Sequence, residues 1–211
     1  MKLTKFEHSC LILEVADERL IIDPGTFTMP LGEFGDVVAV VVTHEHGDHW
    51  TPDQLERILD RNPGAVIYAP AGVAAAAGEL PVTVVKDGDV IEAGPFTLKF
   101  FGEKHAVIHS SIPVIDNVGV LVNDELYYAG DSFVVPPVAV KTLAVPAGAP
   151  WMKISEAMDY VVEIAPKRAF PVHEMVLSVF GKGLSNDRLS WATQQGGGEY
   201  FVLEPSETLD L

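Results

Sequence analysis

The sequence predicts an α/β protein with two β-sheets and helices packed outside them. A meander of short apolar strands opens the chain, and from about residue 37 strand-like runs alternate with helical segments. The chain has 211 residues, of which 48% are hydrophobic. It is therefore long enough to bury a substantial core, and we expect one domain spanning residues 1–211.

Apolar runs near the N-terminus predict the meander. Strands are expected at residues 3–6, 10–15 and 19–22. Asp17 and Glu18 turn the second of these strands into the third, and Asp23-Pro24-Gly25 ends the meander. Residues 37–42 are β-branched except Ala39, which is typical of a buried strand.

Capping residues and breakers define the helices further along the chain. Thr51-Pro52-Asp53-Gln54 supplies an N-cap Thr and a Pro in the first turn, and it predicts a helix to about Asp60. The other expected helices span residues 72–77, 155–164 and 186–194. Pro166 ends the second of these three.

The remaining strands follow from short apolar runs. They are expected at residues 65–68, 82–85, 96–101, 118–122, 125–129, 143–145, 169–172 and 200–203. Residues 96–101 alternate between apolar and polar side chains, as in a half-buried strand. Residues 118–122 and 125–129 form a hairpin that turns at Asn123-Asp124.

The most informative motif is Thr43-His44-Glu45-His46-Gly47-Asp48-His49, directly after the buried strand at 37–42. Imidazole nitrogen and carboxylate oxygen are preferred ligands of Zn²⁺ and similar divalent ions. His44 and His46 can converge on one ion while Asp48 and His49 turn toward a second. Two ions about 3.5–4 Å apart would need further ligands from elsewhere in the chain.

Further candidate ligands again follow predicted strands. They are His105 or His109, Asp131 and His173. His105 comes soon after the strand at 96–101, whereas His109 lies four residues later in a loop, so the strand-end position favours His105. Asp131 follows Gly130, which permits a tight turn.

This order of residues resembles the metallo-β-lactamase superfamily, whose signature His-x-His-x-Asp-His is matched by residues 44–49. Gly130-Asp131 and the late His173 continue the resemblance. Within the superfamily the chain is similar to the subgroup containing L-ascorbate-6-phosphate lactonase, through His8-Ser9, Ile22-Asp23-Pro24, Val145-Pro146-Ala147-Gly148 and Pro171-Val172-His173. The resemblance implies a four-layer αββα sandwich of the metallo-β-lactamase type.

The resemblance also implies a division of the ligands. His44, His46 and the middle histidine would bind one metal, Asp48, His49 and His173 would bind the second, and Asp131 would bridge them. With His105 as the middle ligand, His109 would line the pocket and contact substrate. Zn²⁺ is the first expectation for both ions, and Mn²⁺ or Fe²⁺ also suits the mixture of His and Asp.

Two nearby residues have open interpretations. Asp23 either forms a turn before Pro24-Gly25 or accepts a hydrogen bond from a metal-bound imidazole and so orients it. His8 is expected to be buried behind the ligands rather than to be one of them. The single cysteine, Cys10, lies in an apolar strand and is expected in the core.

The expected reaction is hydrolysis of an ester, lactone, amide or phosphoester bond of a small molecule by hydroxide activated between two metals. Asp48 or Asp131 would handle the proton. The alternatives are a di-iron redox protein and a metal-binding protein without turnover. The di-iron alternative would usually need an electron-delivering partner or domain. The alternative that binds metal without turnover would be expected to have lost one of the metal ligands.

The net charge argues against some classes of partner, and the apolar runs and cysteine content bear on cellular location. The net charge is -16, from 30 acidic and 14 basic residues. Nucleic acids and anionic membrane surfaces need clustered cations, so neither is expected to bind. No apolar run is long enough for a membrane span or a signal peptide, and with a single cysteine this predicts a cytoplasmic protein. The sequence does not define an oligomeric state.

Overall fold

The predicted meander forms one half of a mixed sheet. In the computed structural model, which describes residues 1–211, this first sheet has the strand order β14-β1-β2-β3-β4-β5-β6. Its strands are β1 (Lys2–Lys5), β2 (Leu11–Val15), β3 (Glu18–Ile22), β4 (Val37–Val41), β5 (Val66–Ala69), β6 (Val82–Val84) and β14 (Thr208–Asp210). β1, β2 and β3 pair antiparallel, whereas β3 to β6 pair parallel.

The second sheet has the order β13-β12-β11-β10-β9-β8-β7. Its strands are β7 (Val90–Ala93), β8 (Phe96–Phe101), β9 (Gly119–Val122), β10 (Leu126–Tyr128), β11 (Thr142–Pro146), β12 (Arg168–Val172) and β13 (Glu199–Tyr200). β9 and β10 form the predicted hairpin, in which Leu126 lies opposite Val122. From β10 onward the strands pair parallel.

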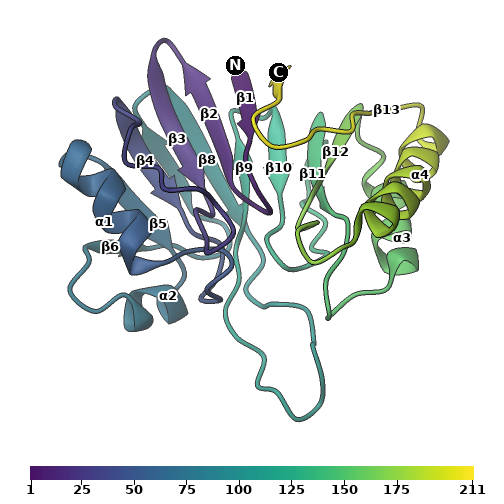
Figure 1. The fold of residues 1–211 in the computed structure, drawn as a ribbon, viewed down its shortest axis with the longest axis horizontal. Helices are drawn as coiled ribbons and strands as arrows, with labels where there is room; N and C mark the ends of the chain where they lie inside the picture. The colour runs from purple at the N-terminus through teal and green to yellow at the C-terminus, as the bar shows by residue number, and fades with distance from the viewer.

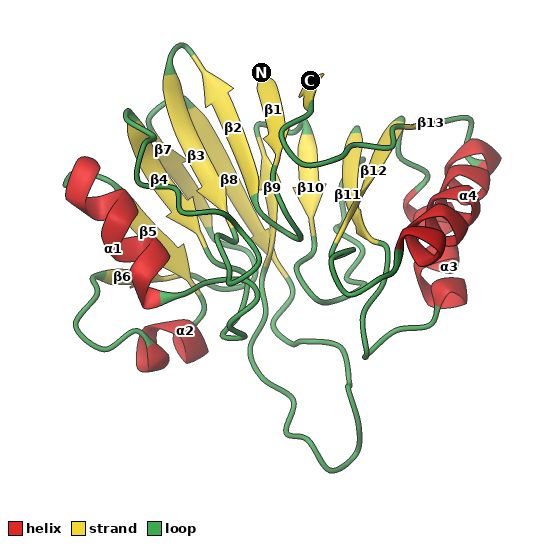
Figure 2. Cartoon of the chain, in the orientation of Figure 1, coloured by secondary structure: helices red, strands yellow, loops and turns green.

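Helices cover the outer face of each sheet (Figures 1 and 2). α1 (Pro52–Arg61) and α2 (Ala71–Ala76) lie outside the first sheet, and α3 (Ile154–Ile164) and α4 (Val179–Gln195) lie outside the second. The hydroxyl of Thr51 accepts a hydrogen bond from the backbone N–H of Gln54 at 3.2 Å, as the predicted cap requires. None of the helices combines the length and apolarity needed to cross a membrane.

Three apolar layers hold the sheets and helices together. The largest core lies between the two sheets and includes Leu13, Leu98 and Tyr128. Val40 and Ile58 belong to the core beneath α1 and α2, and the third core lies beneath α3 and α4. The alternation of helix, sheet, sheet and helix layers confirms the predicted αββα sandwich.

The structure differs from the sequence-based expectations mainly near the C-terminus. α4 begins at Val179 rather than near residue 186, because Ser178 caps it by accepting the Gly181 N–H at 3.1 Å. Two glycines in its first turns weaken the helical signal in the sequence. The strand expected at 200–203 is reduced to Glu199–Tyr200. The sequence does not predict β7 and β14, and each is defined by pairing with a neighbouring strand, β8 and β1 respectively.

Candidate metal centre

The metal-capable residues meet where strands of both sheets end. The loop after β4 carries His44 to His49, while β8, β10 and β12 lead to the segments that carry the remaining candidates, His105, Asp131 and His173. Backbone hydrogen bonds join the segments: Val118 N–H donates to Thr43 O at 2.9 Å, and His173 N–H donates to His8 O at 3.0 Å. Residues far apart in the chain are thereby brought to one edge of the sandwich.

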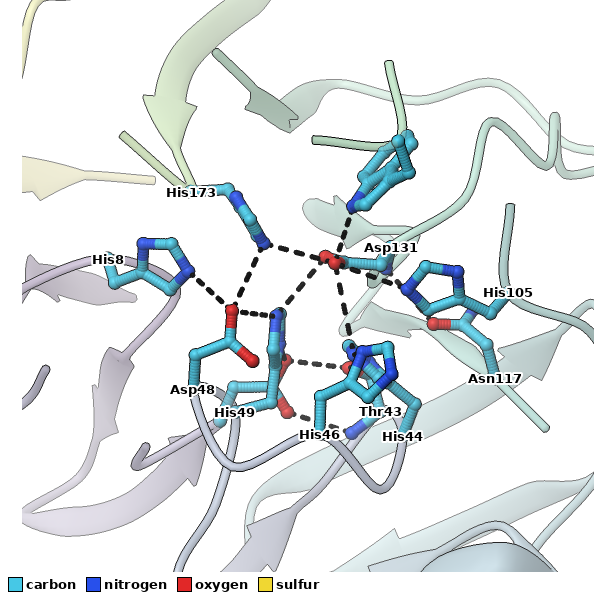
Figure 3. Close-up of polar contacts among 12 residues, drawn as sticks. His8, Thr43, His44, His46, Asp48, His49, His105, Asn117, Asp131 and His173 are labelled. Atoms are coloured by element: carbon cyan, nitrogen blue, oxygen red, sulfur yellow. Dashed lines mark hydrogen bonds and ion pairs between the residues drawn. The ribbon is translucent and has the colours of Figure 1, made fainter. Parts of the chain in front are cut away.

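Two groups of side chains can each hold a metal ion (Figure 3). One group is His44, His46, His105 and Asp131, and the other is His8, Asp48, His49 and His173. The ligand atoms within each group lie within 4.8 Å of one another. Asp131 joins the groups, because its Oδ2 lies 3.4 Å from His105 Nε2 and 3.0 Å from His173 Nε2.

Four of the imidazoles have one ring nitrogen tied to an oxygen outside the centre. His105 Nδ1 lies 2.6 Å from Ala106 O and His173 Nδ1 lies 2.8 Å from Gly148 O, so each must donate its proton there. His49 Nδ1 lies 2.7 Å from Asp23 Oδ2, and His44 Nδ1 lies 3.0 Å from the Thr43 hydroxyl. These bonds assign the Nδ1–H tautomer and leave the Nε2 lone pairs facing the centre.

Asp23 is the hub of this orienting network. Its carboxylate is buried and accepts from the Thr43 backbone N–H at 2.8 Å and from the Thr43 hydroxyl at 2.7 Å, in addition to His49. Because the Thr43 hydroxyl gives its proton to Asp23, it must accept from His44. Of the two interpretations of Asp23, the structure therefore supports a role in orienting histidines.

His8 has the opposite tautomer. Its Nδ1 accepts the Met175 N–H at 3.4 Å, so its Nε2 carries the proton and donates to Asp48 Oδ2 at 3.2 Å. Burial lowers the pKa of His8 to about 4, which keeps the ring neutral. His8 belongs to the second of the two groups by distance, but its Nε2 carries a proton and so has no free lone pair for a metal. His8 instead donates a hydrogen bond to Asp48, a candidate ligand.

Asp131 is held from both its backbone and its side chain. Gly130 has a φ of +65° and packs so closely that an added Cβ would lie 2.4 Å from Asn117 Oδ1. The same Asn117 oxygen accepts the Asp131 N–H at 3.0 Å. The indole N–H of Trp151 donates to Asp131 Oδ2 at 2.7 Å. Burial raises the pKa of the Asp131 carboxyl, but His49 and His173 outweigh that effect and hold it well below its usual range.

Burial and neighbouring side chains also shift the pKa values of His44, His46 and His49. Burial lowers the pKa of His44 well below its usual range, and burial followed by His105 lowers the pKa of His46. Burial also disfavours a charged His49, yet the carboxylates of Asp131 and Asp23 raise its pKa well above the ordinary value. Burial therefore favours neutral imidazoles, and the two carboxylates oppose that effect at His49.

The structure brings together all predicted metal ligands and separates His109 from them. His109 is exposed in the loop between β8 and β9, where its Nδ1 lies 2.7 Å from the Ser111 hydroxyl. His105, in contrast, is buried among the other candidates. Trp151 and Asn117 are not predicted, because nothing local in the sequence marks a tryptophan or an asparagine as the partner of a distant aspartate.

The donor atoms at the centre fit a bound metal. His49 Nε2, His105 Nε2, His173 Nε2 and Asp131 Oδ1 are buried without a hydrogen-bond partner. Buried polar atoms in folded proteins are normally partnered, so a cluster of orphaned acceptors facing one another calls for a cation between them. Imidazole and carboxylate together match the preferences of Zn²⁺, Mn²⁺ and Fe²⁺.

Two known proteins are similar to this chain over most of their length. The chain is 42% identical over 198 residues to protein Rv0786c of Mycobacterium tuberculosis, covering 92% of this chain and 93% of that protein. It is 28% identical over 184 residues to the UPF0173 protein PF0020 of Pyrococcus furiosus, covering 82% and 83%.

A solved structure and a family match agree with the architecture. Igni18, a novel metallo hydrolase from the hyperthermophilic archaeon Ignicoccus hospitalis, has a TM-score of 0.74 at 22% identity over 99% of this chain and 97% of that chain, which shows a shared fold. Residues 2–173 match the family described as the beta-lactamase superfamily domain. The predicted superfamily is thereby confirmed, and the chain belongs to the beta-lactamase superfamily domain family.

Proposed function

We propose that this protein is a metal-dependent hydrolase of small molecules with a two-metal centre. The observation that carries the proposal is the orientation of four histidines. His44, His49, His105 and His173 each place Nδ1 against an oxygen and leave Nε2 directed inward. Metal-ligating histidines are typically oriented in this way.

The ligands divide between two ions. His44, His46 and His105 would hold the first, and Asp48, His49 and His173 would hold the second. Asp131 would be shared between them, since its Oδ1 lies 3.2 Å from His49 Nε2 while its Oδ2 faces His105 and His173. Zn²⁺ is the preferred ion, and Mn²⁺ or Fe²⁺ fits the same donors.

Bound divalent ions supply Lewis acidity and a water molecule whose pKa falls to about 7. The chain's own contribution is positioning and proton transfer. Asp48 is better placed than Asp131 to move a proton, because its side chain is 29% exposed whereas that of Asp131 is 2% exposed. The contacts of Asp48 with His8, His49 and His173 all involve Oδ2, so Oδ1 takes no part in them.

The substrate carries an ester, lactone, amide or phosphoester bond. Within this range we favour a lactone or ester without a phosphate group over the phosphorylated lactone of the lactonase-like subgroup. Lys104, the cation nearest to His105 in sequence, lies 2.8 Å from the carboxylate of Asp116, which offsets its positive charge. The net charge of -16 also disfavours polyanionic substrates. His109, which is exposed on its loop, would contact the substrate rather than a metal.

Metal analysis combined with a substrate screen tests the proposal. Purified protein is assayed for bound metals by mass spectrometry and screened against lactones, thioesters, phosphodiesters and β-lactams. Asp48→Ala should abolish turnover, while Asp60→Ala, on the exposed side of α1, should not. About two zinc or manganese ions and turnover that is lost on chelation and restored by metal are expected.

Two other results would each point to a different function. Bound iron with oxygen consumption would indicate a redox protein. Bound metal without turnover on any of the four substrate classes would indicate a protein that only binds metal. Protein that takes up no divalent ion would contradict the metal centre itself.

A further inference from the structure

We infer that Trp151 is a positioning residue of the metal centre, whose indole N–H sets the rotation of the bridging Asp131 carboxylate. The inference rests on the proposed metal-dependent function and adds a residue to its machinery. Trp151 Nε1 lies 2.7 Å from Asp131 Oδ2, and the tryptophan is 8% exposed. A short bond in such a buried setting is well defined and strong for a neutral donor.

The indole N–H distinguishes the two oxygens of Asp131. Indole is a donor only, so Trp151 never competes with the carboxylate for a metal. Its bond occupies one lone pair of Oδ2 and leaves the other for the centre, where His173 Nε2 lies at 3.0 Å and His105 Nε2 at 3.4 Å. Oδ1 has no hydrogen-bond partner and faces His49. Rotation of the carboxylate would break this arrangement.

Aromatic contacts hold the indole in place. Its ring packs against Phe133 with centroids 5.3 Å apart, and edge-on against His105 at 5.7 Å and His173 at 6.2 Å. Phe133 is supported in turn by Tyr160 of α3, at 5.3 Å. Trp151 therefore has a fixed orientation relative to two candidate ligands as well as to the carboxylate that it contacts.

The same segment also orients a second ligand. Trp151 belongs to residues 148–151, between β11 and α3, and Gly148 O in that segment accepts the Nδ1 proton of His173. The loop between β11 and α3 thus donates a hydrogen bond to Asp131, which follows β10, and accepts one from His173, which follows β12. It ties together the bridging ligand and a ligand of the second ion.

The experiment compares Trp151→Phe with two matched variants at the other tryptophans. Trp50→Phe removes a buried indole whose N–H has no partner, and Trp191→Phe removes one that is 51% exposed. Metal affinity is measured by competition with a chelating dye, and Co²⁺ loading is followed by absorption. The unfolding temperature of each metal-free variant is recorded alongside. A Trp50→Phe/Trp191→Phe protein leaves Trp151 as the sole tryptophan, so its fluorescence should change on Co²⁺ binding.

Trp151→Phe is expected to lose about 10- to 100-fold in metal affinity and to alter the Co²⁺ spectrum. Trp50→Phe and Trp191→Phe should keep the wild-type affinity, even if Trp50→Phe unfolds at a lower temperature. Wild-type affinity and spectrum in Trp151→Phe would overturn the inference while leaving the proposed function intact. Equal losses of affinity in Trp151→Phe and Trp50→Phe would also overturn it, as a general packing effect. A wild-type protein that binds no metal would remove both.

Discussion

Lys5 and Glu174 form a buried ion pair, with Lys5 Nζ 2.5 Å from Glu174 Oε1. The pair connects β1, at the start of the chain, to the residue that directly follows His173. Lys5 also donates to Phe6 O at 3.3 Å, so its charge is shared between a carboxylate and a carbonyl. The first strand thereby helps to hold the last candidate ligand in place.

Breaking this pair should destabilise the fold strongly. Lys5→Met leaves the Glu174 carboxylate buried without its partner, which costs about 3–5 kcal/mol of the free energy of unfolding. Urea titration measures this cost. Lys5→Met combined with Glu174→Leu should recover much of the loss, because no charge is then left unpaired. The control is Lys99→Met in the exposed pair with Asp124, where about 0.2–1 kcal/mol is expected. Similar losses for Lys5→Met and Lys99→Met would contradict the role of the buried pair.

His105 and His109 should differ when each is replaced by alanine. His105→Ala removes a buried side chain that faces the centre, so the protein should retain fewer metal ions. His109→Ala alters an exposed loop residue and should keep the wild-type stoichiometry, with any kinetic effect confined to KM. Mass spectrometry of the purified variants gives the metal content. Loss of metal from His109→Ala alone would reverse the assignment.

His8 should act through its N–H rather than as a ligand. His8→Gln keeps a donor near Asp48 and should retain the second metal ion, whereas His8→Leu removes the donor and should weaken its binding by about 10- to 100-fold. Affinity for each ion can be measured by calorimetric titration. If His8→Gln binds the second ion as poorly as His8→Leu, then His8 is itself a ligand.

Cys10 should be inert in the folded protein. It is fully buried, and this burial raises the pKa of its thiol well above the ordinary value, so thiolate is scarce at neutral pH. A thiol reagent such as 5,5′-dithiobis(2-nitrobenzoate) should react with about one equivalent of the denatured chain and with almost none of the native protein. Rapid labelling of the native protein would show that the segment carrying Cys10, directly before β2, opens readily.

Removal of bound divalent metal should loosen the centre and leave the sandwich folded. The three apolar cores lie between layers and do not depend on the ligands, so the metal-free protein should keep its far-ultraviolet circular dichroism. Its unfolding temperature should nevertheless fall, because metal binding to the native state alone stabilises that state. A loss of secondary structure on chelation would instead show that folding requires the metal.

Local patterns in the chain are sufficient to predict most strands, α1 and the positions of the candidate ligands. A run rich in β-branched residues such as Val37–Val41 favours an extended, buried backbone, and Thr51 caps α1 through a contact three residues away. A dense His/Asp motif and polar residues after apolar strands are local features too. The central motif and His173 can therefore be recognised as candidate metal ligands without any knowledge of the tertiary structure.

Contacts between residues distant in the chain are determined only by the tertiary structure. β14 exists because Leu209 pairs with Leu3, and no pattern in its three residues marks it as a strand. Trp151 meets Asp131 across 20 residues, and Glu174 meets Lys5 across 169. The protonated nitrogen of each histidine likewise depends on which oxygen lies beside it. Such choices arise from packing and hydrogen-bond geometry in three dimensions, which residue order does not specify locally.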